Sequence, residues 1–389
     1  MRGEARAGAG GLRTLRASGA RPGRSSALRI VVLVALLYGF LAAVDILGAG
    51  IGGLGRDFTD QLFEGVANPL VGLLVGVLAT VLAQSSSVTT ATLVGLVGAG
   101  VLDLNSAVPV IMGANVGTTI TNTLASLGSI RRVEEFRRAF TGATMHDVFN
   151  LLCVAVLLPL EITTGMLARS ATALSGLFGN VATGDFDSPA KALVESATGL
   201  VGAAVARLPF SVGAQATILV GIGLVLIFAT LVAITRTMKK VIAGPAERSL
   251  NRVLGRSGAL GILVGLALTV SVQSSSIATS LLVPLIAAGV LSLENAYPIT
   301  LGSNLGTTIT ALLAAMAVDR IEGLQIALVH LLFNTVGILL FYPVHAMRRV
   351  PLALAVRLAS FAAKRRALAI VYVVVGFYVI PLVGILVLR

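Results

Sequence analysis

The sequence predicts an all-α polytopic membrane protein built from two inverted-topology repeats, each with a re-entrant helical hairpin and a broken transmembrane helix. Three observations lead to this prediction. The composition is strongly apolar, the basic residues gather in a few stretches between apolar segments, and two polar motifs occur twice at one spacing.

The composition places the chain in a bilayer. Of its 389 residues, 56% are hydrophobic and only 12% are charged, and the mean hydropathy is +0.96. Soluble domains have about 25% charged residues, and several apolar runs here reach the about 20 residues that a helix needs to cross a hydrocarbon core. The single cysteine, Cys153, excludes an internal disulfide framework and a Cys-based cluster. Because the chain also has only three His and no Trp, we expect no transition metal and no cofactor.

The basic residues give the orientation. Most of the 29 Lys and Arg lie in the N-terminal tail and in 131–138, 236–256 and 348–366. The positive-inside rule makes these stretches cytoplasmic, which leaves 50–65, 161–212 and 319–322 outside. We therefore divide the chain into a disordered basic cytoplasmic tail (1–27), a first transmembrane repeat (28–160), an extracellular loop with one short helix near 190–206 (161–212), a second, inverted repeat (213–345), and an amphipathic segment with a C-terminal helix (346–389).

The internal repeat is visible in two motifs. LAQSSSVTT at 82–90 recurs as SVQSSSIAT at 271–279, and MGANVGTTIT at 112–121 recurs as LGSNLGTTIT at 301–310. Both recur at an offset of 189 residues, as 84 to 273 and 115 to 304 show. HDVFN at 146–150 returns more weakly as HLLFN at 330–334, at an offset of 184.

The charge pattern makes the two copies run in opposite directions through the membrane. Each copy must therefore cross the membrane an odd number of times. A re-entrant hairpin at 66–101, followed by one spanning helix at 105–130 that is broken at 113–117, satisfies this requirement. The second copy repeats this with a hairpin at 257–290 and a helix at 295–318 broken at 302–306. Discontinuous helices in inverted repeats are typical of secondary transporters, whose site lies near the midplane, and irregular backbone at membrane depth must line a cavity or be buried in protein.

The residues at the tips and breaks are neutral and rich in oxygen. Each Ser run begins the second arm of a hairpin, where backbone N–H groups and the helix dipole favour an anion, while Asn, Gln and Thr oxygens suit a hard monovalent cation. No Lys or Arg occurs in 66–130 or 257–318. An anion held there without fixed positive charge is costly, so a co-bound cation must supply it. These groups are Gln84, Ser85, Ser86, Ser87, Asn115, Thr118 and Thr119 in the first copy and Gln273, Ser274, Ser275, Ser276, Asn304, Thr307 and Thr308 in the second.

The four motifs, QSSS and PVIMGANVGTTITNTLASL followed by QSSS and YPITLGSNLGTTITALLAAM, resemble the paired signatures of the type II sodium/phosphate cotransporter family. The resemblance covers about 66–160 and 213–345 and implies sodium-coupled symport of inorganic phosphate. It implies phosphate contacts at Ser85, Ser86, Ser87, Ser275 and Ser276, and a sodium site at Gln273, Ser274, Ser303, Thr307 and Thr310. From their chemistry we add Gln84, Asn115, Thr118 and Asn304 to the phosphate set and Thr308 to the sodium set.

Other interpretations remain open. The same architecture serves a cation-coupled symporter of another anion, such as sulfate or a dicarboxylate, and Ser and Thr also pack helices. A channel needs a continuous polar path, and a scaffold would tolerate Ala across the motifs. An intramembrane hydrolase is disfavoured because His146 and Asp147 are adjacent and point about 100° apart on a helix. With His330, they serve polar packing, gating or ion binding.

The expected partners follow from this interpretation. They are inorganic phosphate, sodium ions and the lipid bilayer of the cell membrane, with no nucleic acid, and a homodimer is compatible with the sequence.

Overall fold

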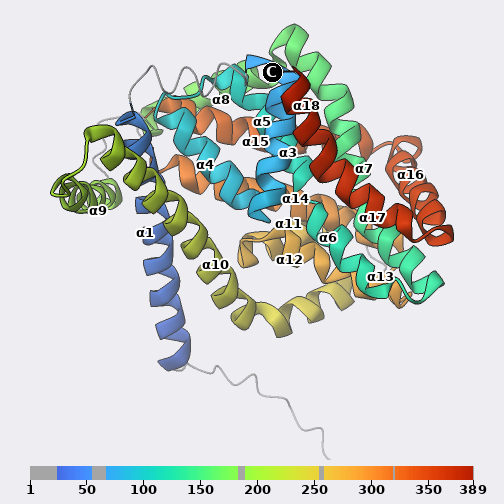
Figure 1. The fold of residues 1–389 in the computed structure, drawn as a ribbon. Helices are drawn as coiled ribbons and strands as arrows, with labels where there is room; N and C mark the ends of the chain where they lie inside the picture. The colour runs from blue at the N-terminus through green and yellow to red at the C-terminus, as the bar shows by residue number, and fades with distance from the viewer. Residues whose placement is uncertain (1–23, 55–66, 183–188, 254–257, 319, 389) are drawn as a thin grey trace, which may run out of the picture.

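A computed structural model describes residues 24–54, 67–182, 189–253, 258–318 and 320–388. All regular structure in these ranges is helical (Figure 1). Five helices are long and apolar enough to cross a membrane: Val31–Gly52, Val133–Thr164, Val212–Thr237, Ile321–Phe341 and Ala367–Leu388. The prediction of an all-α membrane protein is confirmed at this level. The tail at 1–23 lies outside the described residues.

The helices follow one another in the order shown in Figure 1. They are α1 (Arg24–Gly52), α3 (Pro69–Ala83), α4 (Ser86–Gly98), α5 (Leu104–Gly117), α6 (Ile120–Ser126), η2 (Leu127–Ser129), α7 (Val133–Thr164), α8 (Met166–Ala182), α9 (Pro189–Ala206), α10 (Val212–Val253), α11 (Gly258–Val272), α12 (Ser275–Ser280), α13 (Leu282–Ala287), α14 (Leu293–Ala315), α15 (Ile321–Phe341), α16 (His345–Lys364), α17 (Ala367–Val374), the π-helical turn η3 (Val375–Val379) and α18 (Ile380–Leu388).

The two sequence repeats form one packed body. A single cluster of buried apolar side chains includes Ile111 and Phe149 from the first repeat and Tyr297 and Phe333 from the second. Helices α1 and α10 pack against each other along one side of this body, where α1 also contacts α4, and α18 lies against α3 (Figure 1). The apolar core therefore runs across the boundary between the repeats.

Glycines bring the two helices of each repeat into backbone contact. A Cβ on Gly113 of α5 would clash with the carbonyl oxygen of Leu73 in α3, and a Cβ on Gly302 of α14 would clash with that of Ile262 in α11. These contacts correspond at the repeat offset of 189 residues. Close helix contacts of this kind require a residue without a side chain, so the repeated glycines fix how α3 crosses α5 and how α11 crosses α14.

Matching N-caps begin the second helix of each repeat. The Asp103 carboxylate accepts from the Ser106 N–H at 3.0 Å, and the Ser292 hydroxyl accepts from the Asn295 N–H at 3.3 Å. Asp and Ser are favoured at this position because they satisfy N–H groups that have no partner inside the helix. Gly100 and Gly289, three residues earlier, both have positive φ, 74° and 73°.

The prediction of a broken helix is correct for the first repeat only. Here α5 ends at Gly117 and α6 begins at Ile120, so the break lies at Thr118 and Thr119, just after the predicted position. The Thr118 hydroxyl donates to the carbonyl of Ala114 at 2.8 Å, and a hydroxyl bond to the carbonyl four residues back bends helices.

In the second repeat the predicted break at 302–306 is wrong, because α14 is continuous from Leu293 to Ala315. The glycines that suggested it instead permit close packing on α11. The interruption occurs in the preceding arm, at Leu281 between α12 and α13. Pro284 explains it, because a proline ring clashes with the carbonyl four residues earlier, and the equivalent residue in the uninterrupted α4 is Gly95.

The segment 161–212 contains two helices where we expected one. The expected short helix is α9, and α8 precedes it. The buried Glu161 carboxylate at the end of α7 accepts from the N–H groups of Leu167 at 2.6 Å and Ala168 at 3.1 Å, and so caps the start of α8. Gln325 of α15 donates to Ser175 of α8 at 3.2 Å. Helix α8 therefore packs against the second repeat.

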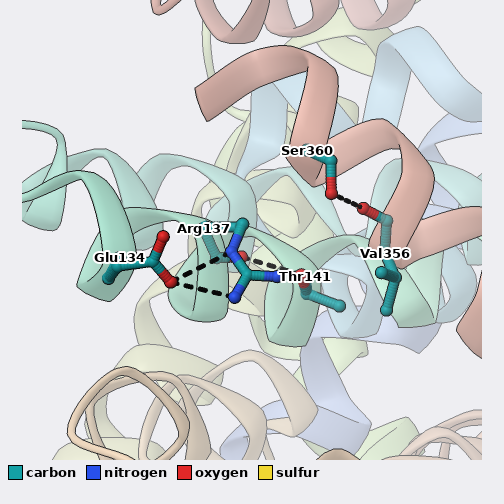
Figure 2. A network of polar contacts seen from close by, with 5 residues as sticks. All are labelled: Glu134, Arg137, Thr141, Val356 and Ser360. Carbon is teal, nitrogen blue, oxygen red and sulfur yellow. Dashed lines mark hydrogen bonds and ion pairs between the residues drawn. The ribbon is translucent and has the colours of Figure 1, made fainter. Parts of the chain in front are cut away.

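The C-terminal segment packs on the first repeat. Figure 2 shows α16 beside the start of α7, where Glu134 and Arg137 form an exposed ion pair at 2.9 Å. On the facing helix the Ser360 hydroxyl donates to the carbonyl of Val356 at 2.7 Å. An exposed pair at this spacing stabilises by less than about 1 kcal/mol, so burial of Phe136 and Phe140 against Ala359 and its neighbours contributes more here.

Candidate functional site

The two QSSS motifs adopt the same backbone. Gln84 and Gln273 end α3 and α11 with φ of 52° and 55°, and they are the only non-glycine residues of the described ranges with positive φ. The next residues, Ser85 and Ser274, are extended, with φ of −157° and −156°. A left-handed glutamine costs free energy relative to a glycine, so the side chain at this position serves a purpose that glycine cannot.

The glutamine side chains are held in the same way at both tips. The amide of Gln84 donates to the carbonyl of Val81 at 2.6 Å, and that of Gln273 donates to the carbonyl of Val270 at 2.7 Å. Each carbonyl oxygen accepts a threonine hydroxyl from the following helix. The distances are 3.5 Å for Thr121 to Gln84 and 3.0 Å for Thr310 to Gln273.

The serines that follow begin the next helix. Ser85 and Ser274 are N-caps, and each hydroxyl accepts a backbone N–H at 3.3 Å, from Val88 and Ile277 respectively. The first-turn N–H groups of α4 lack partners inside the helix and carry the positive end of its dipole. The tip therefore presents hydrogen-bond donors without a fixed positive charge.

The remaining tip serines are the candidates for a bound anion. Ser86 and Ser87 lie in the first turn of α4 and are 7% and 6% exposed. The Ser275 hydroxyl is buried and has no hydrogen-bond partner within the described part of the chain, and Ser276 is half-buried. A buried hydroxyl without a partner loses free energy, which a ligand oxygen at this tip would restore.

The predicted sodium residues lie on α14 and in the turn between α11 and α12. Gln273 and Thr310 are hydrogen-bonded to each other, and the Ser303 hydroxyl donates to the carbonyl of Gly265 in α11 at 3.4 Å. The Thr307 hydroxyl donates to the carbonyl of Asn304 at 2.6 Å. Spacings of four and three residues place 303, 307 and 310 on one helix face, whereas Thr308 points about 100° away from Thr307.

Asparagines join the two repeats at the centre. The Asn304 amide donates to the side-chain oxygens of Asn150 at 3.0 Å and Asn334 at 2.9 Å. The Asn150 amide donates to the backbone carbonyl of Asn115 at 2.7 Å, and Asn334 donates to that of Asn304 at 3.4 Å. The Asn115 side-chain oxygen lies 3.3 Å from Nε2 of His330. This network crosses between the repeats and is fully buried.

The network changes how three predicted phosphate residues are understood. The Asn115 amide donates to the carbonyl of Ile111 at 3.0 Å, Asn304 is used as described above, and the Thr118 hydroxyl is bonded within α5. Each of these side chains makes contacts inside the protein, in contrast to Ser275. Their assignment to phosphate stays a prediction, as do the assignments of the tip serines and of the sodium residues.

Sequence reasoning missed several polar contacts beside the motifs. Asn122 of α6 donates to Thr279 of α12 at 2.7 Å and so links the repeats close to the second tip. Thr123 and Tyr372 both donate to the Asp147 carboxylate. The repeat offset could have identified Thr121 as the counterpart of Thr310. No repeated signal marks Asn122 or Tyr372.

Comparison with known proteins places these motifs in a family. The model of the family described as Na+/Pi-cotransporter matches residues 40–184 and 225–385, which include both tips and both asparagine motifs. The chain belongs to the sodium/phosphate cotransporter family. Members of this family are transporters, and the intramembrane hydrolase is therefore set aside.

Individual relatives agree with this assignment. The chain is 34% identical to sodium-dependent phosphate transport protein 2B of Homo sapiens over 91% of this chain and 64% of that protein. It is 35% identical to sodium-dependent phosphate transport protein 2A of Oryctolagus cuniculus over 91% of this chain and 66% of that protein. The chain thus spans slightly less than two thirds of the length of these two relatives. No solved structure matches it.

Proposed function

We propose that this protein carries inorganic phosphate into the cell by symport with sodium. The observation that supports this most is the duplicated tip. Two motifs 189 residues apart share a left-handed glutamine, a serine N-cap and a threonine that bonds the glutamine oxygen. Two relatives of this chain are named sodium-dependent phosphate transport proteins, which favours phosphate over sulfate or a dicarboxylate.

Phosphate would be held between the tips by neutral donors. Ser86 and Ser87 with the first-turn N–H groups of α4 would donate to phosphate oxygens from one side. The unpartnered Ser275 hydroxyl, with Ser276, would donate from the other. Helix N-termini and hydroxyls stabilise an anion in this way. Since α3–α6 and α11–α14 contain no Lys or Arg, the positive charge must come with the substrate.

Sodium would supply that charge from the second repeat. Gln273 and Ser274, between α11 and α12, and Ser303, Thr307 and Thr310 of α14 offer amide and hydroxyl oxygens. Thr310 bonds Gln273, and Ser303 bonds the carbonyl of Gly265 in α11. A binding site for an anion that is complete only when sodium is present makes uptake depend on the sodium gradient.

The transport motion we propose is alternating access between inverted repeats. In this arrangement α3–α4 and α11–α13 are re-entrant hairpins that enter from opposite sides of the cell membrane. The tail 1–27 is cytoplasmic, 161–212 faces outside, and 346–389 follows the second repeat. The matched crossings of α3 on α5 and α11 on α14 support two equivalent units, as does the network between them.

Cysteine labelling tests the inversion. Asn105 and Glu294 occupy equivalent exposed positions, 189 residues apart, near the starts of α5 and α14. On a background of Cys153→Ala, which removes a buried thiol, Asn105→Cys should react with an impermeant reagent added outside. Glu294→Cys should react only from inside. Reaction of both from one side would rule out inverted repeats.

Uptake into proteoliposomes tests the function. Labelled phosphate should accumulate with an inward sodium gradient and not with an equal choline or potassium gradient, and excess unlabelled sulfate should not compete. Competition by sulfate or a dicarboxylate at concentrations similar to phosphate would favour the other anion instead.

A matched pair of variants ties uptake to the site. Ser275→Ala removes the unpartnered hydroxyl and should weaken phosphate affinity by about tenfold or more, since a hydrogen bond to a charged partner contributes about 1.5–3 kcal/mol. Ser280→Ala is the control, because that hydroxyl donates to the carbonyl of Ile277 in its own helix. Equal phosphate affinity in the two variants would contradict the site.

A further inference from the structure

An apolar cavity lies between the C-terminal helix and the first repeat. It has a volume of about 440 Å³ and is lined mostly by aliphatic side chains of α3, α5, α7, α17, η3 and α18, among them Val77 and Leu151. Figure 1 shows α18 beside α3, and η3 also packs on α3. Leu151 of α7 and Ile380 of α18 are 47% and 54% exposed, so the cavity opens at the protein surface.

The length of the cavity matches the depth of one bilayer leaflet. On the C-terminal side its lining runs from Val371 to Pro381, which is about 15 Å along a helix axis. The hydrocarbon core of a bilayer is about 30 Å thick, so one leaflet accounts for about half of it. These residues belong to the candidate membrane span Ala367–Leu388, and the facing α7 is another candidate span. An apolar space of this length within the membrane fits a single acyl chain.

One wall of the cavity contains a glycine in an irregular turn. The π-helical turn η3 covers Val375–Val379 and includes Gly376, which lines the cavity. A Cβ added to Gly376 would meet no heavy atom within 4 Å. Single π-helical turns inside α-helices are frequent at functional sites. The space beside Gly376 can therefore hold a ligand group, and a larger side chain at this position would enter it.

Basic residues gather where the two candidate spans around the cavity begin. Lys364, Arg365 and Arg366 directly precede α17, and all three are exposed. Arg131 lies just before α7 and is exposed as well. The guanidinium of Arg366 donates to the carbonyl of Arg131 at 3.4 Å, so the starts of the two spans lie side by side.

The acidic residues in the first turn of α7 do not neutralise these basic residues. Glu134 is paired with Arg137 at 2.9 Å (Figure 2), and Glu135 is paired with Arg132 at 3.0 Å. None of the ion pairs found within the described residues includes the four basic residues at the starts of the two spans. A surplus of positive charge therefore lies beside the cavity.

We infer that the cavity binds one acyl chain of an anionic phospholipid whose phosphate group is held by Arg365 and Arg366. Guanidinium groups bind phosphate oxygens in pairs, and basic residues beside membrane spans recognise anionic headgroups. Val371 lines the cavity and lies about 7.5 Å along the helix from Arg366, so one lipid molecule reaches both features. This inference goes beyond the transport function and does not depend on it.

Fluorescence quenching by brominated lipids tests the inference. The chain contains no tryptophan, so one introduced tryptophan reports only its own surroundings. Ile380→Trp places the reporter at the cavity, and Val225→Trp places it on an exposed position of α10, also near the middle of a candidate span.

The expected result is a preference for the anionic lipid at the cavity alone. In nanodiscs of phosphatidylcholine, brominated phosphatidylglycerol should quench Ile380→Trp at about tenfold lower mole fraction than brominated phosphatidylcholine, since each basic residue near the headgroup contributes about fivefold. The two brominated lipids should quench Val225→Trp equally. Equal quenching of Ile380→Trp by both lipids would overturn the inference, as would the same preference at Val225→Trp.

Charge variants that carry Ile380→Trp test the headgroup contact. Arg365→Gln with Arg366→Gln should remove most of the preference for phosphatidylglycerol. Arg207→Gln with Arg236→Gln removes the same charge from exposed positions beside α9 and on α10 and should leave the preference unchanged. An equal preference in these two double variants would overturn the inference. Because Arg365 and Arg366 are exposed, their replacement leaves the buried core intact.

A cavity-filling variant tests the acyl-chain contact. Gly376→Leu, also combined with Ile380→Trp, places a side chain in the cavity and should remove the preference for phosphatidylglycerol. Gly221→Leu in α10 is its control, because that position likewise has no heavy atom within 4 Å of an added Cβ and does not line the cavity. A preference that persists in Gly376→Leu would overturn the inference, and the charge variants keep the test decisive if Gly376→Leu does not fold.

Discussion

The two repeats are nearly identical at their tips and differ in the helices around them. Gln84 and Gln273 have φ values within a few degrees of each other, although the arm after the second tip is interrupted at Leu281 and the arm after the first is not. The helix after the first hairpin breaks at Thr118, whereas α14 is continuous. Because the tip geometry persists while neighbouring helices vary, the tips are the units that the fold holds fixed.

The comparison also separates symmetric from asymmetric chemistry. Hydroxyls and amides recur in both repeats, which suits a substrate bound between them. Asp147 is a buried carboxylate of the first repeat, and the residue at the corresponding position of the second repeat is the apolar Leu331. The predictions below test how far the equivalence extends.

The largest effect is expected at the glycine crossings. Gly113→Ala and Gly302→Ala each place a methyl group against a backbone carbonyl of the facing helix. Backbone cannot move away as a side chain can, so each should cost more than about 3 kcal/mol and abolish monodisperse protein. Gly221→Ala in α10, with no heavy atom within 4 Å of the added carbon, should fold normally. Size-exclusion profiles measure this, and a well-folded Gly113→Ala would break the equivalence.

The tips and the repeat could be predicted from sequence because they depend on local patterns. A Gln followed by three serines twice at one spacing, with glycines at matching positions, is enough to place Gln84 and Gln273 at helix ends. Asn115 and Asn304 stand in the second repeated motif, and Asn150 and Asn334 stand in the weaker repeat of 146–150 at 330–334.

The rest depends on packing that leaves no repeated signal. Gly-Thr-Thr-Ile-Thr follows the asparagine motif in both repeats, yet only the first copy breaks the helix. The Thr118 hydroxyl bonds the carbonyl of Ala114, four residues back, whereas the corresponding Thr307 hydroxyl bonds the carbonyl of Asn304, three residues back. The contact between Tyr372 and Asp147 joins residues 225 positions apart, and no pattern in the sequence predicts it.

The next effect is expected in the asparagine network. Asn304→Ala leaves the side-chain oxygens of Asn150 and Asn334 without their donor, at about 1–3 kcal/mol each. Asn115→Ala removes only one side-chain contact between the repeats, the one to Nε2 of His330. It should therefore lower the stability of the protein about half as much as Asn304→Ala. Thermal unfolding in detergent measures both, with the exposed Asn105→Ala as control. A larger effect at Asn115 would reverse the comparison.

A smaller difference is expected between the two glutamine partners. Thr310 donates to Gln273 at 3.0 Å within the proposed sodium site, whereas Thr121 lies 3.5 Å from Gln84, at the limit of a hydrogen bond. Thr310→Val should raise the sodium concentration for half-maximal phosphate uptake by about tenfold or more, and Thr121→Val by less than about threefold. Equal shifts would mean that the first tip also holds sodium.

The smallest effect concerns the N-caps at the starts of α5 and α14. Asp103→Ala and Ser292→Ala each remove one side-chain acceptor for a helix N–H, at about 1 kcal/mol. Asp103 also places a negative charge at the positive end of α5, worth about 0.3–1 kcal/mol at an exposed site, so Asp103→Ala should lower the unfolding temperature more than Ser292→Ala.

Two further measurements isolate that charge. Asp103→Asn keeps a side-chain acceptor but removes the charge, so its unfolding temperature should lie between those of the unaltered protein and Asp103→Ala. The difference in unfolding temperature between Asp103→Ala and Ser292→Ala should become smaller in high salt, because salt screens exposed charges beyond the Debye length of about 3 Å at 1 M. A gap that persists at 1 M salt would show that the two caps differ in packing, and the equivalence of the repeats would then end at the helix starts.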